Sequence, residues 1–150
     1  SFGVKTYYNK TAVRLVKEND ASANDLNFHL SDAPDIAQTI AVTAFGLGKA
    51  CEMTGLHTLK IKETDRLVAL KTELEKLGAK VTITNESLKL EPSNSINADI
   101  SIVTYKDHRM AMAFAPLGLK TSLQIENADV VSKSYPQFWE DFAAIGFKIK

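Results

Sequence analysis

Helix-like and strand-like segments alternate along this chain, and that alternation limits its fold more than any other feature. Apolar periodicity predicts helices at about 33–47, 64–77, 107–118 and 134–145, and each ends at or beside a glycine. Strand-like runs fall at 2–8, 13–16, 26–30, 81–83, 88–90, 100–103, 122–125 and 147–149. A turn separates the two runs between 81 and 90, so these two predict a hairpin. The interleaving indicates a fold of the α/β or α+β class.

Start signals accompany the first and the last of these helices. Asp32 stands where it could cap the first helix, with Pro34 in the first turn. Ser134 and Gln137 have the spacing of a capping box, with Pro136 between them. The interior of the first helix is apolar on nearly all sides, so we expect it to be largely buried.

Length, charge and cysteine content exclude several classes of protein. The 150 residues suit a single domain that buries a real core. The formal net charge is zero, which argues against nucleic acid as the main partner. No apolar run approaches the ~18 residues of a membrane span. Cys51 is the one cysteine and lies in an apolar stretch, so we expect a buried structural thiol and a cytoplasmic location.

Arginine is rare in this chain, and its placement points to an anion site. Of 18 basic residues only three are arginines. Arg66 and Arg109 stand in the charged clusters 62–66 and 107–109, each at a predicted helix start. Free backbone NH groups and the arginine fork both favour carboxylate or phosphate there.

An ordinary structural role remains open for each of these residues. A charged cluster at a helix start is commonly a cap, and Asp35, His108 and Lys133 could be surface or capping residues. No histidine, cysteine and carboxylate set has the spacing of metal ligands, and no glycine-rich phosphate loop is found.

Four short segments resemble motifs of the enolpyruvyl transferases, in the order that the family has them. They are Ala-Pro-Asp-Ile-Ala-Gln-Thr at 33–39, Lys-Glu-Thr-Asp-Arg-Leu at 62–67, Asp-His-Arg-Met-Ala-Met at 107–112 and Lys-Ser-Tyr-Pro at 133–136. Together they are similar to the 5-enolpyruvylshikimate-3-phosphate synthase (3-phosphoshikimate 1-carboxyvinyltransferase) family, from about residue 20 onward. One position departs from that pattern: Thr58 stands where some members carry asparagine.

The resemblance implies a fold and a reaction. The family builds two domains from βαβαββ units in an inside-out barrel, with the active site between the domains. Its members join phosphoenolpyruvate to shikimate 3-phosphate and release phosphate, without a metal or organic cofactor. Residues 1–150 would form a single partial domain of about two units, from the C-terminal half, with the N-terminal half absent.

The resemblance also implies roles for individual residues. Asp35 would contact the shikimate hydroxyls and help to deprotonate the attacking one, and Glu63 would protonate the methylene carbon of phosphoenolpyruvate. Arg66 and Arg109 would hold that substrate's carboxylate and phosphate. Lys133 would bind phosphate and assist proton transfer; Lys62 would face shikimate 3-phosphate, and His108 would support the site. We expect Asp35, Glu63, Arg66, Arg109 and Lys133 to gather on one wall of a cleft.

Three further expectations follow for the 150-residue chain. It should be catalytically inactive alone, because half of a closing site cannot enclose its substrates. The family is usually monomeric, but an exposed apolar edge could let copies of this chain self-associate. Two alternatives stay open: a sister enzyme that transfers enolpyruvyl to a UDP-sugar, and a non-catalytic, repeated α/β binding module.

Overall fold

The computed structural model describes residues 2–18, 25–61 and 65–149. Its largest described sheet has four strands, in the order β3-β4-β6-β5. The strands are β3 (Asp25–His29), β4 (Ala50–Thr54), β5 (Val81–Ile83) and β6 (Leu88–Leu90). β3 and β4 are parallel, whereas β6 is antiparallel to both of its neighbours. The predicted hairpin at 81–90 is thus confirmed.

Two helices connect the strands of this sheet. They are α1 (Ala37–Gly46), preceded by the 3-10 helix η1 (Pro34–Ile36), and α2 (Arg66–Lys76), which follows the 3-10 helix η2 (His57–Ile61). The parallel pair β3 and β4 needs a crossover, which α1 supplies. The element order is β3-α1-β4-α2-β5-β6, so one complete βαβαββ unit is present, as the resemblance implied.

A second set of elements repeats the first part of this order. It comprises β7 (Ile100–Ile102), α3 (His108–Phe114), η3 (Ala115–Leu119), β8 (Leu123–Ile125), η4 (Ala128–Lys133) and α4 (Phe138–Ala144). β7 and β8 pair in parallel, again across a helical connection. The set therefore matches β-α-β-α, the first four elements of a unit.

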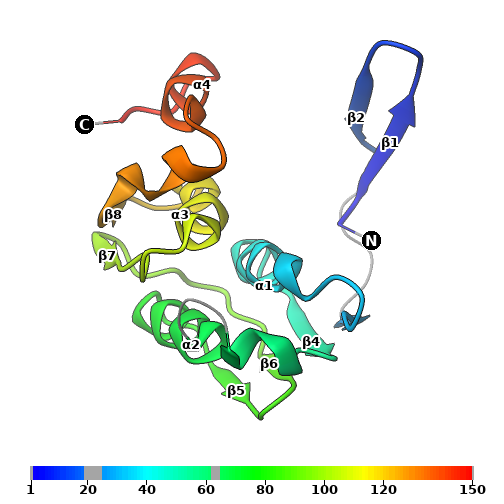
Figure 1. Ribbon diagram of the computed structural model, residues 1–150, viewed down its shortest axis with the longest axis vertical. Helices are drawn as coiled ribbons and strands as arrows, with labels where there is room; N and C mark the ends of the chain where they lie inside the picture. Colours follow the sequence, from blue (N-terminus) through cyan, green and yellow to red (C-terminus); the bar gives the residue numbers. More distant parts are fainter. Residues whose placement is uncertain (1, 19–24, 62–64, 150) are drawn as a thin grey trace.

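The remaining two strands form an antiparallel hairpin near the N-terminus, β1 (Val4–Tyr8) and β2 (Val13–Lys17). Figure 1 shows it standing away from the helices. Nearly all of its side chains are exposed, including large apolar ones such as Tyr8 and Leu15. An exposed apolar surface was expected; self-association through it stays a prediction.

Helices α1, α2 and α3 form the inside of this arrangement and the strands its outside, whereas α4 lies at the edge, with Phe138 as its buried residue. In Figure 1, α1, α2 and α3 are seen almost end-on beside one another, with β4, β5, β6 and β7 outside them. The main apolar core lies between these layers. Seven of the ten residues of α1 are buried, which confirms the expectation from its all-round apolar character. Cys51 in β4 is 1% exposed, so the predicted buried thiol is confirmed as well.

The structure corrects two strand predictions. Residues 50–54 form β4, in the middle of the sheet, although the sequence did not predict a strand there. Alanine, glutamate and methionine are weak strand formers, and hydrogen bonds from β3 and β6 on both sides override that preference. Residues 147–149 are not a strand; among the described residues no strand pairs with them.

Both expected caps at the outer helices are wrong. The 3-10 turn η1 separates Asp32 from α1, and neither start is capped by a side chain. The last helix begins only at Phe138, with Gln137 as an N-cap residue that makes no side-chain hydrogen bond. Pro136 disfavours helical geometry at Tyr135, the residue before it, and Ser134 is instead the C-cap residue of the separate helix η4.

No helix within the described part of the chain is long and apolar enough to cross a membrane.

Candidate active site

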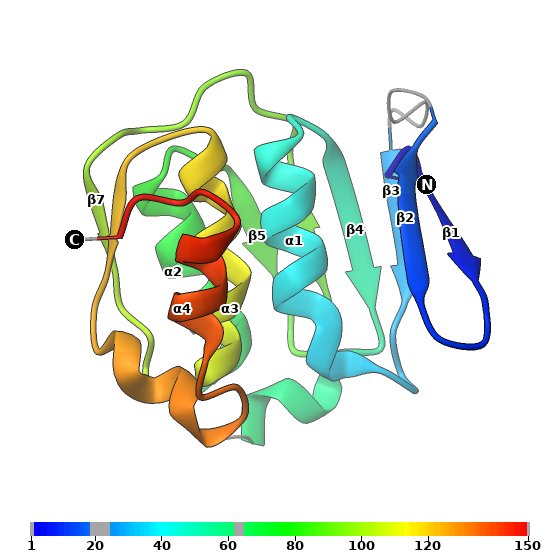
Figure 2. The same ribbon diagram turned by 90° about the horizontal axis from the view of Figure 1, so that it is seen from above.

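The starts of the four α-helices lie along one side of the molecule. In Figure 2 the helices run upward side by side, and η1, η2 and η4 lie along the same lower edge, at the helix starts. Helix N-termini carry unpaired NH groups and a partial positive charge, so this edge suits anions. The two charged clusters singled out in the sequence both lead into helices here, α2 and α3.

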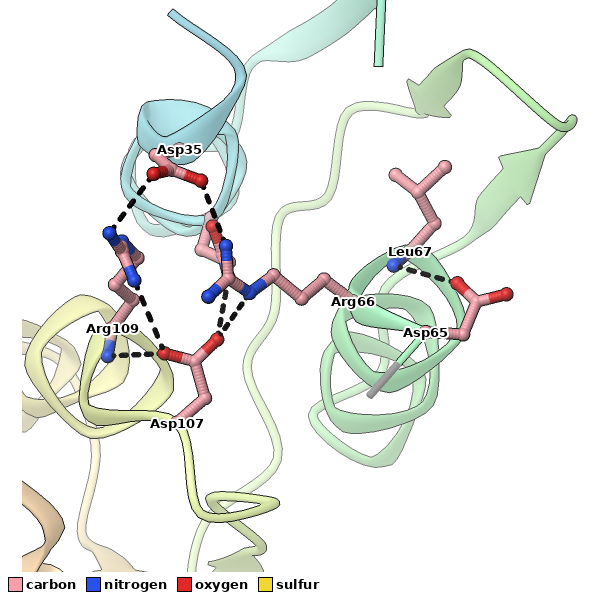
Figure 3. Close-up of polar contacts among 7 residues, drawn as sticks. Asp35, Asp65, Arg66, Leu67, Asp107 and Arg109 are labelled. Atoms are coloured by element: carbon pink, nitrogen blue, oxygen red, sulfur yellow. Dashed lines mark hydrogen bonds and ion pairs between the residues drawn. The ribbon is translucent and has the colours of Figure 1, made fainter. Parts of the chain in front are cut away.

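Asp35 joins three of these elements. It lies in η1, and its two carboxylate oxygens face different arginines (Figure 3). Oδ1 accepts a hydrogen bond from Nη1 of Arg66 at 2.8 Å. Oδ2 accepts one from Nη2 of Arg109 at 3.0 Å. One carboxylate thereby links the starts of α2 and α3 to the entrance of α1.

Asp107 is the second carboxylate of the site, and sequence reasoning gave it no site role. It is the N-cap of α3, and its Oδ1 accepts from the backbone NH of Arg109 at 2.9 Å. Its Oδ2 forms an ion pair with Nε of Arg66 at 2.6 Å. Gln38 of α1 donates to the same oxygen at 3.4 Å. The position of Asp107 at the start of a predicted helix was the visible signal; its ionic partner was not.

We name Asp35, Arg66, Asp107 and Arg109 the arginine–aspartate cluster. Its two positive and two negative formal charges cancel. Arg66 and Asp107 are almost fully enclosed, with side chains 1% and 0% exposed, whereas Asp35 and Arg109 are 40% and 31% exposed. A buried charge requires such pairing, because desolvation is otherwise too costly. The exposed half, Asp35 and Arg109, is the half that solvent or a ligand can reach.

The cluster modifies the expectation for Arg66. Three of the five residues expected on one wall, Asp35, Arg66 and Arg109, do lie together. Arg66, however, is enclosed between two aspartates, so a direct contact with substrate would require the cluster to rearrange. As it stands, Arg66 orients Asp35 and Asp107 instead.

Other expected site residues lie outside this set of contacts. His108 is the half-buried first residue of α3, and Lys133 is the exposed last residue of η4. Within the described chain, no hydrogen bond or ion pair joins either side chain to the cluster. η4 packs against α3, which keeps Lys133 on the α3 side of the molecule. Lys62 and Glu63 fall outside the described residues, just before Asp65.

Asp65 fixes the start of α2 beside the cluster. Its Oδ1 accepts from the backbone NH groups of Leu67 and Val68, at 3.1 and 3.2 Å. It is therefore the N-cap of α2, and it places Arg66 at the first helical position. The motif 62–67 thus contains a structural cap as well as the buried arginine.

The described residues contain no group of three or more His, Cys, Asp or Glu that could hold a metal ion. What the cluster can do chemically follows from its exposed half. A guanidinium can bind a carboxylate or phosphate, and a neighbouring carboxylate can accept a hydrogen bond from a hydroxyl. Such a pair could hold an acidic substrate next to an alcohol.

Comparison with known proteins places this geometry in a family. The sequence profile described as EPSP synthase (3-phosphoshikimate 1-carboxyvinyltransferase) matches residues 3–142. A 3-phosphoshikimate 1-carboxyvinyltransferase of Bacteroides fragilis is 45% identical over 151 residues, covering 99% of this chain and 37% of that protein. The protein of the same name from Syntrophobacter fumaroxidans is 35% identical over 141 residues, covering 93% and 33%.

Solved structures share the fold. The EPSP synthase of Acinetobacter baumannii superposes with a TM-score of 0.81 at 22% identity, covering 98% of this chain and 37% of that one. The enolpyruvyl transferase NikO of Streptomyces tendae superposes with a TM-score of 0.63 at 15% identity, covering 99% and 34%. The chain thus spans about a third of the length of these proteins. Because the family profile covers nearly all of its residues, this chain belongs to the EPSP synthase (3-phosphoshikimate 1-carboxyvinyltransferase) family.

Proposed function

We propose that the protein containing this chain transfers the enolpyruvyl group of phosphoenolpyruvate to the 5-hydroxyl of shikimate 3-phosphate and releases phosphate. This is a step of the shikimate pathway toward aromatic amino acids. The observation that carries the proposal is the half-exposed pair of Asp35 and Arg109, held by buried Arg66 and Asp107. Two relatives of this chain are named for this activity, which supports the proposal.

The reaction needs the groups that the site offers. The hydroxyl oxygen attacks C2 of phosphoenolpyruvate while C3 gains a proton and the hydroxyl loses one. Phosphate then leaves C2, and a proton leaves C3, which restores the double bond between C2 and C3 and gives the enol ether product. Two separately placed carboxyl groups can divide this proton traffic, and cations can hold the anionic substrates in line.

We assign the roles as follows. Asp35 orients the attacking hydroxyl and takes part in its deprotonation, and Glu63 protonates C3. Arg109 holds phosphoenolpyruvate with its exposed guanidinium, while Arg66 acts from beneath by fixing Asp35. Lys133 binds phosphate and assists proton transfer, Lys62 faces shikimate 3-phosphate, and His108 supports α3. No metal or organic cofactor takes part, and the reaction takes place in the cytoplasm.

We propose further that residues 1–150 belong to one domain of the C-terminal half and contribute one wall of the site. The 150-residue chain alone should then release no phosphate from the two substrates. Steady turnover by the purified chain would contradict this division of the site.

A chimeric enzyme tests the proposal directly. The chain replaces the matching 151 residues of the Bacteroides fragilis protein, and phosphate release from phosphoenolpyruvate is measured with shikimate 3-phosphate or a UDP-sugar as acceptor. We expect turnover with shikimate 3-phosphate alone. Turnover with the UDP-sugar would favour the sister enzyme, and a folded chimera without activity would favour a binding module.

Two variants of the chimera test the assigned roles. Glu63→Gln should lower kcat by about 10²–10⁴-fold, the usual contribution of a general acid. Arg109→Gln should mainly raise the KM for phosphoenolpyruvate. Arg14→Gln, at an exposed arginine of β2, is the matched control and should leave both constants unchanged.

A further inference from the structure

Glu73 is a fully buried carboxylate that the proposed chemistry does not use. It lies in α2, is 0% exposed, and receives three donors from two directions. Its Oε1 accepts from the hydroxyl of Tyr105 at 2.8 Å. Its Oε2 accepts from the backbone NH of Val103 at 3.1 Å and from Nζ of Lys76 at 2.7 Å. Two of these three donors belong to the segment that connects β7 to α3.

That connecting segment, residues 103–107, ends at the arginine–aspartate cluster. Tyr105 and Lys106 both have left-handed backbone conformations, with φ of 53° and 59°. Such conformations are unfavourable for side-chain-bearing residues and persist only where surrounding contacts impose them. Directly after this bend come Asp107 and Arg109, whose positions therefore depend on what holds the bend.

Helix α2 holds the segment at both ends with one face. Arg66 and Glu73 are seven residues apart, two helical turns and about 10 Å, so they project from the same side. Glu73 binds residues 103 and 105, while Arg66 binds Asp107. Two fixed points on a rigid helix define the path of the short segment between them.

Burial strengthens the contact that Glu73 makes with residues 103 and 105. Lys76 offsets the charge of Glu73 and also donates to the carbonyl of Ser101 at 3.3 Å. Desolvation and the neighbouring Glu73 raise the pKa of Tyr105 to about 12. The tyrosine hydroxyl therefore remains a proton donor throughout the neutral range.

We propose that Glu73 and Tyr105 are positioning residues of the site: they latch residues 103–107 onto α2 and thereby hold Asp107 and Arg109 against Arg66. The latch is a claim about this chain alone. Its catalytic consequence rests on the proposed function.

Hydrogen exchange in the 150-residue chain tests the latch itself. Tyr105→Phe and Glu73→Gln should each speed exchange of amides 103–110 by at least about tenfold, because the segment opens locally. Amides of β5 and β6 should be unchanged. Glu75→Gln is the matched control, since Glu75 lies on the same helix in an exposed pair with Lys71. Unchanged exchange at 103–110, or equal acceleration everywhere, would overturn the latch; if Glu73→Gln does not fold, Tyr105→Phe decides.

Kinetics of the chimera test the positioning role. In Tyr105→Phe, kcat/KM for phosphoenolpyruvate should fall by at least about tenfold, through a raised KM, because a misplaced binding group costs that much. A merely structural role would lower the active fraction, and hence kcat, at unchanged KM. The double variant Glu73→Gln/Tyr105→Phe should lose little more kcat/KM than the worse single variant, because both changes weaken the same contact between Tyr105 and Glu73.

The two proposals fail in different ways. An inactive parent chimera would contradict the proposed function. Hydrogen exchange would then still test the latch independently. An active parent whose Tyr105→Phe variant keeps the parental KM for phosphoenolpyruvate would overturn the positioning role alone.

Discussion

Arg66 shows how one residue can be both part of a site motif and part of the core. Its guanidinium is enclosed, and it contacts carboxylates from η1 and from the start of α3. Pairing with two aspartates makes burial of the charge tolerable. The same pairing ties three helix starts together, so the residue stabilises the fold where it shapes the site.

Replacing Arg66 by methionine tests this dual role. Asp107 would remain buried without its close cation, so Arg66→Met should lower the free energy of unfolding by about 3–5 kcal/mol. Urea unfolding of the 150-residue chain measures the change. Arg14→Met, at an exposed position, should stay within about 0.5 kcal/mol of the parent. Equal effects of the two substitutions would refute a stabilising role for the buried pair.

Cys51 is a buried residue to which we assign no role in the site. Burial raises the pKa of its thiol to about 11. The thiolate is the reactive form, so the folded chain should react with a thiol reagent at pH 8 only as fast as it opens. Urea above the unfolding transition should speed labelling to the rate of a free cysteine. Rapid labelling of the fully folded chain would show that the thiol is accessible.

At the scale of elements, the helix starts decide where the charged side chains lie. Asp65 and Asp107 cap α2 and α3 and so place Arg66 and Arg109 at the first and second helical positions. Asp32 looked equally suitable in the sequence, but η1 intervenes and it caps nothing. A cap depends on the local backbone path as well as on residue type.

Asp65 and Asp32 give a matched test of helix capping. Asp65→Ala removes the acceptor of two backbone NH groups and should cost about 1 kcal/mol of unfolding free energy. Asp32→Ala should cost almost nothing. Both values come from urea unfolding of the same chain. A larger loss for Asp32→Ala would mean that the cap assignments are reversed.

At the scale of the whole molecule, the two hairpins of the chain have contrasting surroundings. β5 and β6 carry buried residues such as Leu88 and Leu90 and belong to the four-stranded sheet. β1 and β2 pair only with each other among the described strands, and almost every side chain is exposed. An isolated two-stranded hairpin is marginally stable in water.

Hydrogen exchange should separate the two hairpins. Amides of 81–90 that pair within the sheet should exchange at least about 100-fold more slowly than the paired amides of 4–17, because they open only with the core. Exchange at several chain concentrations also reports on self-association, which would protect 4–17 as concentration rises. Equal protection of both hairpins at low concentration would show that β1 and β2 are anchored more firmly than their exposure implies.

The sequence alone determined the features that depend on neighbouring residues. Periodicity placed the helices, all-round apolar character predicted the burial of α1, and Gly78, with φ of 96°, marked the end of α2. Turn residues predicted the hairpin of β5 and β6. The family motifs also led to Asp35, Arg66 and Arg109, which do meet.

Only the tertiary structure decided which charges are buried and what they pair with. The ion pairs of Asp35 join residues 31 and 74 positions apart, and the contact of Glu73 with Tyr105 spans 32. β4 likewise became a strand because β3 and β6 flank it, despite weak strand-forming residues. Burial and long-range pairing depend on the path of the whole chain through space, and no local pattern of residues encodes that path.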